Sequence, residues 1–262
     1  RGALGRAPVL MPMHFEDGFP IIGENGKVPE VVTVLDTGYQ YAAINGSDDF
    51  FYKPDENGQI TLKNFWEFNH QQMDDFWSVT ENPGHLRLHS AKLSPTLFQA
   101  YNTLTQRTVG PKCAAEVTLR FAHMKNGDVA GISTFIGNYG FTGVKKENDQ
   151  FYLIMMGRPA NDTTVFGQFE YENPGLEYAR VPIYGESICL RAEADFTDKR
   201  DLSSFYYKEG DNWQKLGIDQ PMYFKMDLFT GCRFGLFYYS TEQTGGYVDF
   251  SKFQFIWPEY VY

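Results

Sequence analysis

Hydrophobic and polar residues alternate along much of the chain, and this pattern predicts β-strands. In residues 113–121 every second residue is apolar, and the residues between them include Glu116, Thr118 and Arg120. Alternation with period two places one face of a strand in a core and the other toward solvent. An Asn126-Gly127 turn and the apolar residues 129–136 follow. We therefore expect 113–121 and 129–136 to form a hairpin.

Similar patterns continue to the end of the chain. No long stretch has helical spacing, and a short helix is expected only near residues 98–101. The sequence has no repeat with a fixed period, so a complete propeller is not expected. Many short strands separated by turns predict an all-β protein, either a sandwich or a barrel. The further strands are expected at 187–195, at 204–208 and 213–216 around a turn, at 233–240 and at 247–256.

The beginning of the chain differs from the rest. Residues 1–30 are rich in Gly and Pro, so only short strands fit between these breakers. We expect 1–30 to be the tail of an upstream domain, 31–47 to be a linker, and 48–262 to be a β-sandwich domain. The first residue is Arg1 rather than Met, and no signal-peptide pattern follows. The natural start is therefore expected upstream, or the chain was cut.

The charge and cysteine content of the chain limit the classes of partner that it can bind. The formal net charge is −10 and no run of Lys or Arg stands out, so nucleic acid and anionic membranes are poor partners. A neutral sugar is compatible with this charge. No apolar run is long enough to span a membrane. The odd cysteine count, three, does not indicate a disulfide framework and leaves the compartment open, whether cytoplasmic, periplasmic or extracellular.

Three stretches resemble, in their order and spacing, the C-terminal sandwich of bacterial family 43 glycoside hydrolases of the β-xylosidase and α-L-arabinofuranosidase kind. They are FWEFNH at 65–70 with FWSVTENPGHLRL at 76–88, then NTLTQR at 102–107, then FTGCRFGLF at 229–237 with GGYVDF at 245–250. In addition, GRAP, HFEDGFP and GKVP within residues 5–29 are similar to the tail of that family's catalytic propeller. Phe15 and Phe19 stand where tryptophan is more usual.

The resemblance implies a concanavalin A-like, jelly-roll type sandwich of two antiparallel sheets, and the strand pattern agrees with it. It also implies that the chain is an accessory domain of an enzyme that acts on xylan-derived β-xylosides or α-arabinofuranosides. Such a domain would brace an upstream catalytic propeller. It would also supply one wall of the active-site pocket.

Family 43 enzymes invert the anomeric carbon with a general acid and a general base, and these carboxylates lie on the propeller blades. The blades would precede Arg1, so we expect no catalytic residue in this chain and no activity from it alone. Glu16 and Asp17 are expected to be turn or surface residues. Phe229 matches a phenylalanine that closes one side of the propeller pocket in related xylosidases. The alternative is that Phe229 caps the sandwich core.

No cofactor is required by this interpretation, but a structural calcium ion is a candidate. Asp249 lies in a YVDF stretch resembling the last strand of several concanavalin A-like sandwiches, where the aspartate helps to bind calcium. Asp49 is a second oxygen donor that could join it. The alternative is a surface aspartate on an alternating strand. His85 and His89 fall on one predicted strand face and are expected to be ordinary polar residues.

Several aromatic and polar residues remain open between packing and sugar binding. Trp66 and Trp77 could stack on sugar rings, but at least one is expected in the core. Gln106 and Arg107 are expected to make structural hydrogen bonds. Tyr207 and Tyr239 are expected on exposed strand faces.

Two other functions compete with the accessory role. One is a stand-alone carbohydrate-binding module for xylan-type glycans, and the other is a structural or oligomerisation module. The candidate partners are accordingly the propeller, a xylo-oligosaccharide or arabinoside, and a second copy of the chain.

Overall fold

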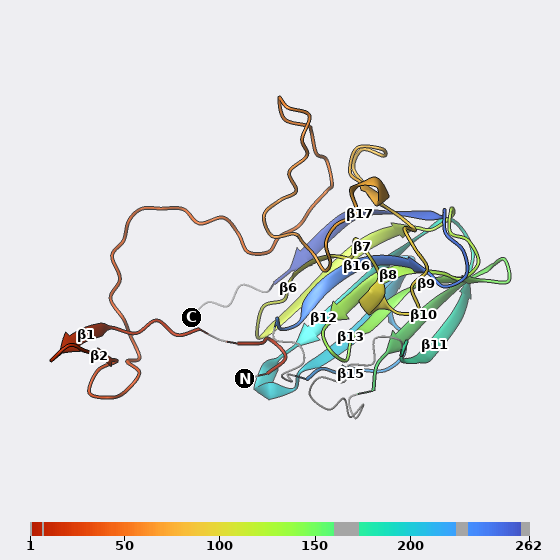
Figure 1. Ribbon diagram of the computed structural model, residues 1–262. Coiled ribbons are helices and arrows are strands. Elements are labelled where there is room, and N and C mark those ends of the chain that lie inside the picture. The colour runs from red at the N-terminus through yellow and green to blue at the C-terminus, as the bar shows by residue number, and fades with distance from the viewer. Residues whose placement is uncertain (1, 7, 160–172, 224–229, 258–262) are drawn as a thin grey trace.

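Two antiparallel sheets pack face to face in the computed structural model of the chain (Figure 1). The structure describes residues 2–6, 8–159, 173–223 and 230–257. One sheet has seven strands in the order β11-β10-β9-β8-β16-β6-β3. In chain order they are β3 (Glu67–Phe68), β6 (Leu104–Arg107), β8 (Asp128–Phe135), β9 (Gly140–Glu147), β10 (Gln150–Gly157), β11 (Leu176–Ile183) and β16 (Arg233–Ser240).

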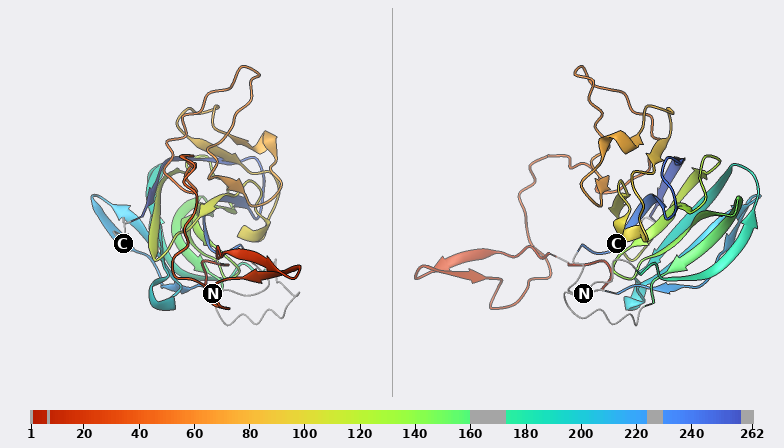
Figure 2. Two further views of the ribbon diagram at one scale, coloured as in Figure 1. Left: turned by 90° about the vertical axis from the view of Figure 1, so that its left-hand side faces the viewer. Right: turned by 45° about the vertical axis from the view of Figure 1, so that its right-hand side comes forward.

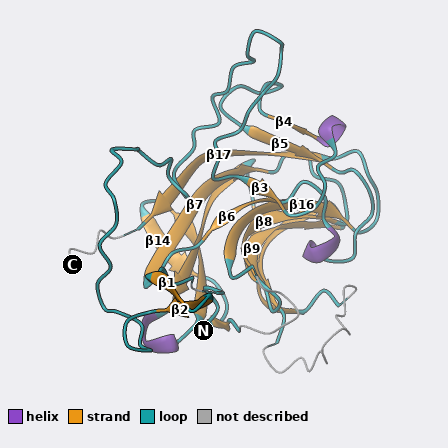
Figure 3. Ribbon diagram, turned by 60° about the vertical axis from the view of Figure 1, so that its left-hand side comes forward, coloured by secondary structure: helices purple, strands orange, loops and turns teal. Residues whose placement is uncertain are grey.

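The other sheet has the order β14-β13-β12-β7-β17-β5-β4, and β15 pairs with β13 at its side. Figure 3 shows the two layers curving over one another. The predicted all-β sandwich is therefore confirmed. The strands of this eight-stranded sheet are β4 (Trp77–Ser78), β5 (Leu86–His89), β7 (Lys112–Arg120), β12 (Ser187–Asp195), β13 (Leu202–Glu209), β14 (Asn212–Lys215), β15 (Gln220–Pro221) and β17 (Tyr247–Ile256).

Alternating side chains of both sheets meet in one central core. On β7 the apolar positions from Cys113 to Leu119 are at most 4% exposed, as the sequence pattern predicts. On β17 the core residues include Val248 and Phe250, at most 1% exposed. Burying a large apolar side chain contributes about 1.5–3 kcal/mol, so this core is the main source of stability. All three cysteines are free.

The predicted hairpin of residues 113–121 with 129–136 is wrong, because these strands lie in different sheets. β7 pairs with β12 and β17, whereas β8 pairs with β9 and β16. After β7, the N–H of Phe121 donates to the Glu186 carbonyl and the chain crosses between the layers. The connection from 121 to 127 is longer than the two to five residues of a tight hairpin. The other predicted hairpin, β13 with β14, is confirmed.

The seven-stranded sheet is also covered on its outer face. The 3₁₀ turn η2 (Leu97–Gln99), close to the predicted short helix, packs a second apolar cluster against this face. Phe98 contacts Phe135 and Tyr139 with ring centroids 5.4 and 4.8 Å apart. Tyr239 belongs to this cluster and is 4% exposed, so its predicted place on an exposed face is wrong.

After residues 2–5, which contact the sandwich, the chain stands away from it as far as residue 44 (Figure 1). β1 (Met13–Glu16) and β2 (Phe19–Ile22) form a separate two-stranded sheet that projects to one side (Figures 1 and 2). The chain rejoins the sandwich at residues 46–48, where Gly46 bonds to Gln106 and where Asp48 and Phe253 exchange backbone hydrogen bonds at 2.9 Å. The division into residues 1–30, 31–47 and 48–262 stays a prediction. The other 3₁₀ turns are η1 (Asp74–Phe76) and η3 (Thr197–Lys199).

Candidate functional site

The most unusual surface of the molecule is its N-terminal arm, which we define as residues 8–44. Figure 2 shows it leaving the sandwich and carrying the β1–β2 hairpin at its outer end. Most of the large hydrophobic side chains exposed in the described structure lie on it. Val31, Leu35 and Tyr41 are 82%, 86% and 86% exposed. Apolar surface gathered in this way marks a site of contact with another protein or domain.

Within the described residues, the hairpin of the arm pairs with no further strand. Its register runs from Met13 opposite Ile22 to Glu16 opposite Phe19, and every strand residue is exposed. Glu16 and Asp17 lie at its turn, as predicted for surface or turn residues. Two strands alone are marginally stable in water, and a free strand edge is a template for pairing with another sheet. Both features indicate that the hairpin is completed by a partner.

The arm is anchored where it meets the sandwich. Ala3 is fully buried. Its N–H donates to Asp201 Oδ2 at 3.0 Å, and its carbonyl accepts from the Cys232 N–H at 2.7 Å. A Cβ at Gly231 would lie 2.3 Å from the Leu4 carbonyl oxygen, so glycine permits this close approach.

Residues 2–5 are therefore attached to the sandwich, and the arm of residues 8–44 extends beyond them. Phe229, the predicted pocket-wall residue, lies outside the described residues. The segment that directly follows it, 230–232, is the one that holds Ala3.

The two aspartates predicted as calcium ligands have different surroundings. Asp249 on β17 is 5% exposed, and its Oδ1 accepts from Arg87 Nε at 2.7 Å. Its Oδ2 accepts from Arg87 Nη2 at 2.9 Å and from Asn82 at 2.8 Å. Burial alone would raise the pKa of Asp249, but these hydrogen bonds outweigh it and hold the pKa below its usual range. Asp49 is exposed and accepts the Phe51 N–H at 3.3 Å.

This arrangement does not fit a calcium site built on Asp249. The guanidinium of Arg87 occupies both carboxylate oxygens, and a cation would have to displace it. Calcium also needs six to eight oxygen ligands. Within the described ranges, no group of three or more His, Cys, Asp or Glu side chains could hold a metal ion.

Neighbouring Asp48, which sequence reasoning did not single out, has a structural role. It is 2% exposed and accepts from Trp66 Nε1 at 2.8 Å and from the Phe50 N–H at 2.9 Å. Lys63 Nζ lies 3.1 Å from its Oδ1. Trp66 is therefore one of the core tryptophans, and its pairing with Asp48 is a signal that only the folded chain reveals.

The remaining predicted polar residues pair locally. Gln106 is fully buried and makes both amide hydrogen bonds to the backbone of Gly46, at 3.0 and 3.1 Å, which confirms the structural interpretation. Arg107, the next residue, is exposed. His89 contacts Glu81 Oε2 at 3.1 Å, and the His85 ring contacts the Pro83 carbonyl at 3.3 Å.

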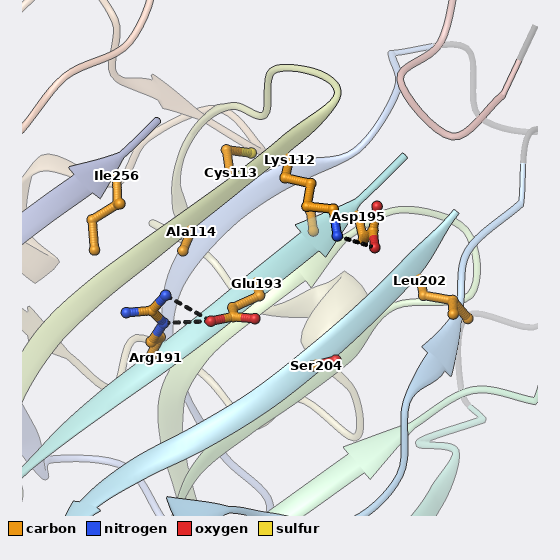
Figure 4. A pocket seen from close by; sticks show the side chains of 10 residues that line it. Lys112, Cys113, Ala114, Arg191, Glu193, Asp195, Leu202, Ser204 and Ile256 are labelled. Atoms are coloured by element: carbon orange, nitrogen blue, oxygen red, sulfur yellow. Dashed lines mark hydrogen bonds and ion pairs between the residues drawn. The ribbon is translucent and has the colours of Figure 1, made fainter. Parts of the chain in front are cut away.

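A hollow of about 230 Å³ opens on the outer face of the eight-stranded sheet (Figure 4). Its charged side chains are paired with one another: Lys112 Nζ lies 2.9 Å from Asp195, and Arg191 lies 2.6 Å from Glu193. Exposed pairs of this kind contribute little stability. They form a polar surface around Ala114.

Comparisons with known proteins identify the family. The family described as "Beta xylosidase C-terminal Concanavalin A-like domain" matches residues 55–256. A "Beta-xylosidase" of Formosa agariphila is 27% identical over 96% of this chain and 43% of that protein. A solved structure titled "Bifunctional GH43-CE Bacteroides eggerthii" is 36% identical with a TM-score of 0.80, over 97% of this chain and 31% of that one.

A second solved structure, from work on engineering the active site of a GH43 glycoside hydrolase with endo-xylanase and exo-arabinofuranosidase activity, is 27% identical. Its TM-score is 0.80, and the match covers 97% of this chain and 50% of that one. The chain thus spans half or less of the length of these relatives. No described helix is long and apolar enough to cross a membrane. The family match covers most of the chain and the sandwich agrees with it, so the chain belongs to the concanavalin A-like C-terminal domains of family 43 β-xylosidases and arabinosidases.

Proposed function

We propose that this chain is the accessory part of a family 43 glycoside hydrolase that acts on xylan-derived β-xylosides or α-L-arabinofuranosides. Its sandwich braces the catalytic propeller and contributes one wall of the active-site pocket. The observation that carries the proposal is the apolar, unpaired N-terminal arm, because it needs a partner surface. The relatives are longer proteins named as β-xylosidases or titled as GH43 enzymes, which supports the propeller as that partner.

The arm supplies enough apolar surface for a stable contact. Phe15 and Phe19 on the hairpin are 66% and 72% exposed, and Leu35 in the following stretch is 86% exposed. Full burial of one such side chain contributes about 1.5–3 kcal/mol, so each exposed apolar side chain of the arm that a partner covers adds to the stability of the contact. The hairpin edges add main-chain hydrogen bonds if they pair with a strand of the propeller.

The proposed pocket wall is Phe229. Its support is indirect: three residues after it, the N–H of Cys232 donates to the carbonyl of Ala3, which lies a few residues before the arm in the sequence. A loop fastened at the root of the arm would be held close to a propeller docked on that arm. An aromatic side chain there would exclude water and contact the apolar face of a pentose.

The test is hydrolysis of the 4-nitrophenyl glycosides of β-xylose and α-arabinofuranose by the chain alone, by the upstream propeller alone, and by the two together. We expect no activity from the chain alone and higher activity from the pair than from the propeller. The variant F15S/F19S should weaken association, whereas Y184S should not, because Tyr184 is 84% exposed but lies outside the arm. With the pair assembled, F229A should raise KM or lower kcat.

Three results would contradict the proposal. Activity of the purified chain alone would place catalytic carboxylates within it. Equal activity of the propeller with and without the chain would remove the accessory role. A dimer of the chain whose formation needs Phe15 and Phe19, and which excludes the propeller, would make a second copy the partner of the arm.

A further inference from the structure

We propose that the groove beside Trp77 binds a neutral carbohydrate chain, separately from the junction formed by the N-terminal arm. The groove has a volume of about 340 Å³, within the range of about 300–1,000 Å³ typical of small-molecule sites. It lies between the loop of residues 54–62 and the η1–β4 segment, at the edge of the eight-stranded sheet where β4 pairs with β5 (Figure 3). Its lining includes Gln59, Gln72, Asp74, Trp77, Ser78 and Thr80.

Trp77 provides an aromatic surface held in a fixed position. Its ring packs against Phe68 with centroids 5.1 Å apart at an interplanar angle of 56°, and its Nε1 donates to Asp74 Oδ1 at 3.3 Å. The residue is only half-buried. Trp66, by contrast, is 7% exposed and belongs to the core. A half-exposed indole in a groove can stack on the apolar C–H face of a sugar ring.

Polar side chains around this indole are positioned by the local backbone and by one another. Gln72 Nε2 donates to Asp74 Oδ1 at 2.7 Å, the same oxygen that accepts from the Trp77 indole. Ser78 Oγ accepts the N–H of Thr80 at 3.1 Å and of Glu81 at 3.0 Å. Ser78 Oγ also lies 3.3 Å from Thr80 Oγ1, so these two hydroxyls form one hydrogen-bonded pair.

The opposite wall is also ordered. Asp55 Oδ1 accepts the backbone N–H groups of Asn57 and Gln59, both at 2.8 Å, and the Asp55 N–H donates to the Gln59 carbonyl at 2.9 Å. This turn presents the Gln59 side chain, and Ile60 beside it packs against the central core. The groove therefore offers two amides, a carboxylate and two hydroxyls around one indole, a set that matches the hydroxyl groups of a sugar.

The charge of the groove selects among ligands. Among the described residues of its lining, Asp74 is the one ionisable side chain, and no Lys or Arg accompanies it. A phosphate, a sulfate or a uronic acid would meet a like charge there, whereas a neutral sugar would not. The choice of a xylan-type chain as the neutral sugar rests on the proposed function, but carbohydrate binding as such does not.

Calorimetric titration of the chain with xylohexaose tests the proposal. We expect saturable binding at millimolar ligand and, for W77A, a loss of affinity of about tenfold or more, the usual effect of removing an aromatic anchor. The double variant Q59A/Q72A changes only exposed side chains and should also weaken binding while the circular dichroism spectrum stays unchanged. W213A is the matched control, because Trp213 on β14 is half-buried on the same sheet but lies outside this groove.

Two outcomes would overturn the proposal: no binding at millimolar xylohexaose, or wild-type affinity in both W77A and Q59A/Q72A.

A xylo-oligosaccharide bearing a glucuronic acid at the bound sugar should bind more weakly than the neutral chain, and D74N should reduce that difference in affinity. The titration uses the chain without the propeller, whereas the accessory role is tested by hydrolysis with the propeller present. Loss of sugar binding and failure of the accessory role are therefore separate results.

Discussion

Replacing Arg87 with Met should destabilise the sandwich more than replacing its partner Asp249 with Asn. In R87M the aliphatic part of the side chain can still pack on the Tyr247 ring, which Arg87 covers at 4.2 Å. The carboxylate of Asp249, 5% exposed, would then keep only the hydrogen bond from Asn82. Breaking a buried ion pair from one side costs about 3–5 kcal/mol, and we expect about 3 kcal/mol here because Asn82 remains.

Asp249→Asn should destabilise the fold less, because it leaves no buried charge without a partner. The Arg87 side chain is 18% exposed and also lies 3.3 Å from Glu81 Oε2, so its charge keeps a partner and some solvent. We therefore expect D249N to cost about 1–2 kcal/mol. The double variant R87M/D249L removes both charges and should cost less than the sum of the single variants.

The contribution of Asp249 to the free energy of unfolding should depend on pH in opposite directions in wild type and R87M. The pKa of Asp249 is lowered in the folded chain, so its contribution is present above the unfolded pKa of about 3.9 and is lost as the pH falls through the folded pKa. Without Arg87 the buried carboxylate should have a raised pKa. R87M should then gain stability relative to wild type as the pH falls from 7 toward 4.

Urea denaturation followed by tryptophan fluorescence, at several pH values and with and without calcium, measures these quantities. The reasoning is refuted if R87M costs less than about 1 kcal/mol, or if D249N costs more than R87M. Calcium should leave the wild-type midpoint unchanged. A calcium-dependent increase that disappears in D249N would instead support the calcium ligand suggested by the sequence.

Two further substitutions probe single contacts. Asp48→Ala should lower the free energy of unfolding by about 3 kcal/mol, because it leaves the buried Trp66 indole N–H without its acceptor. The control D49A changes an exposed neighbour and should lower it by less than about 0.5 kcal/mol. Urea denaturation of both variants measures these differences. Gly131→Ala places a Cβ 2.2 Å from the Thr142 carbonyl oxygen, so β8 and β9 must separate. We expect a loss of about 3 kcal/mol or more in thermal denaturation, and a near-wild-type midpoint would contradict that geometry.

Strand positions could be predicted from the sequence because the signal is local. The expected strand at 233–240 coincides with β16 (Arg233–Ser240), and that at 247–256 coincides with β17 (Tyr247–Ile256). Alternation reports which residues face a core, and each strand carries that information within itself. Strand pairing is different. The Asn126-Gly127 turn is typical of hairpins, yet its neighbours join separate sheets because pairing depends on residues far along the chain.

The candidate sites show the same limit. Tyr239 was placed on an exposed face because its strand alternates, but the segment around Phe98 covers that face from a distant part of the sequence. The sequence identified the N-terminal arm as irregular. It could not reveal that Ala3 is buried beside residues 230–232, since a single alanine carries no pattern.

Because of the second apolar cluster, the two sheets should differ in their tolerance to substitution. The central strands β8 and β16 of the seven-stranded sheet are packed on both faces, so a substitution on either strand meets neighbours whichever way the side chain points. The eight-stranded sheet keeps one face for solvent, where charged pairs can be exchanged at little cost. A saturation mutagenesis scan should therefore show period-two tolerance along β12 and almost none along β8. Relatives should diverge fastest on the outer face of the eight-stranded sheet, and that is where new binding surfaces could arise without loss of the fold.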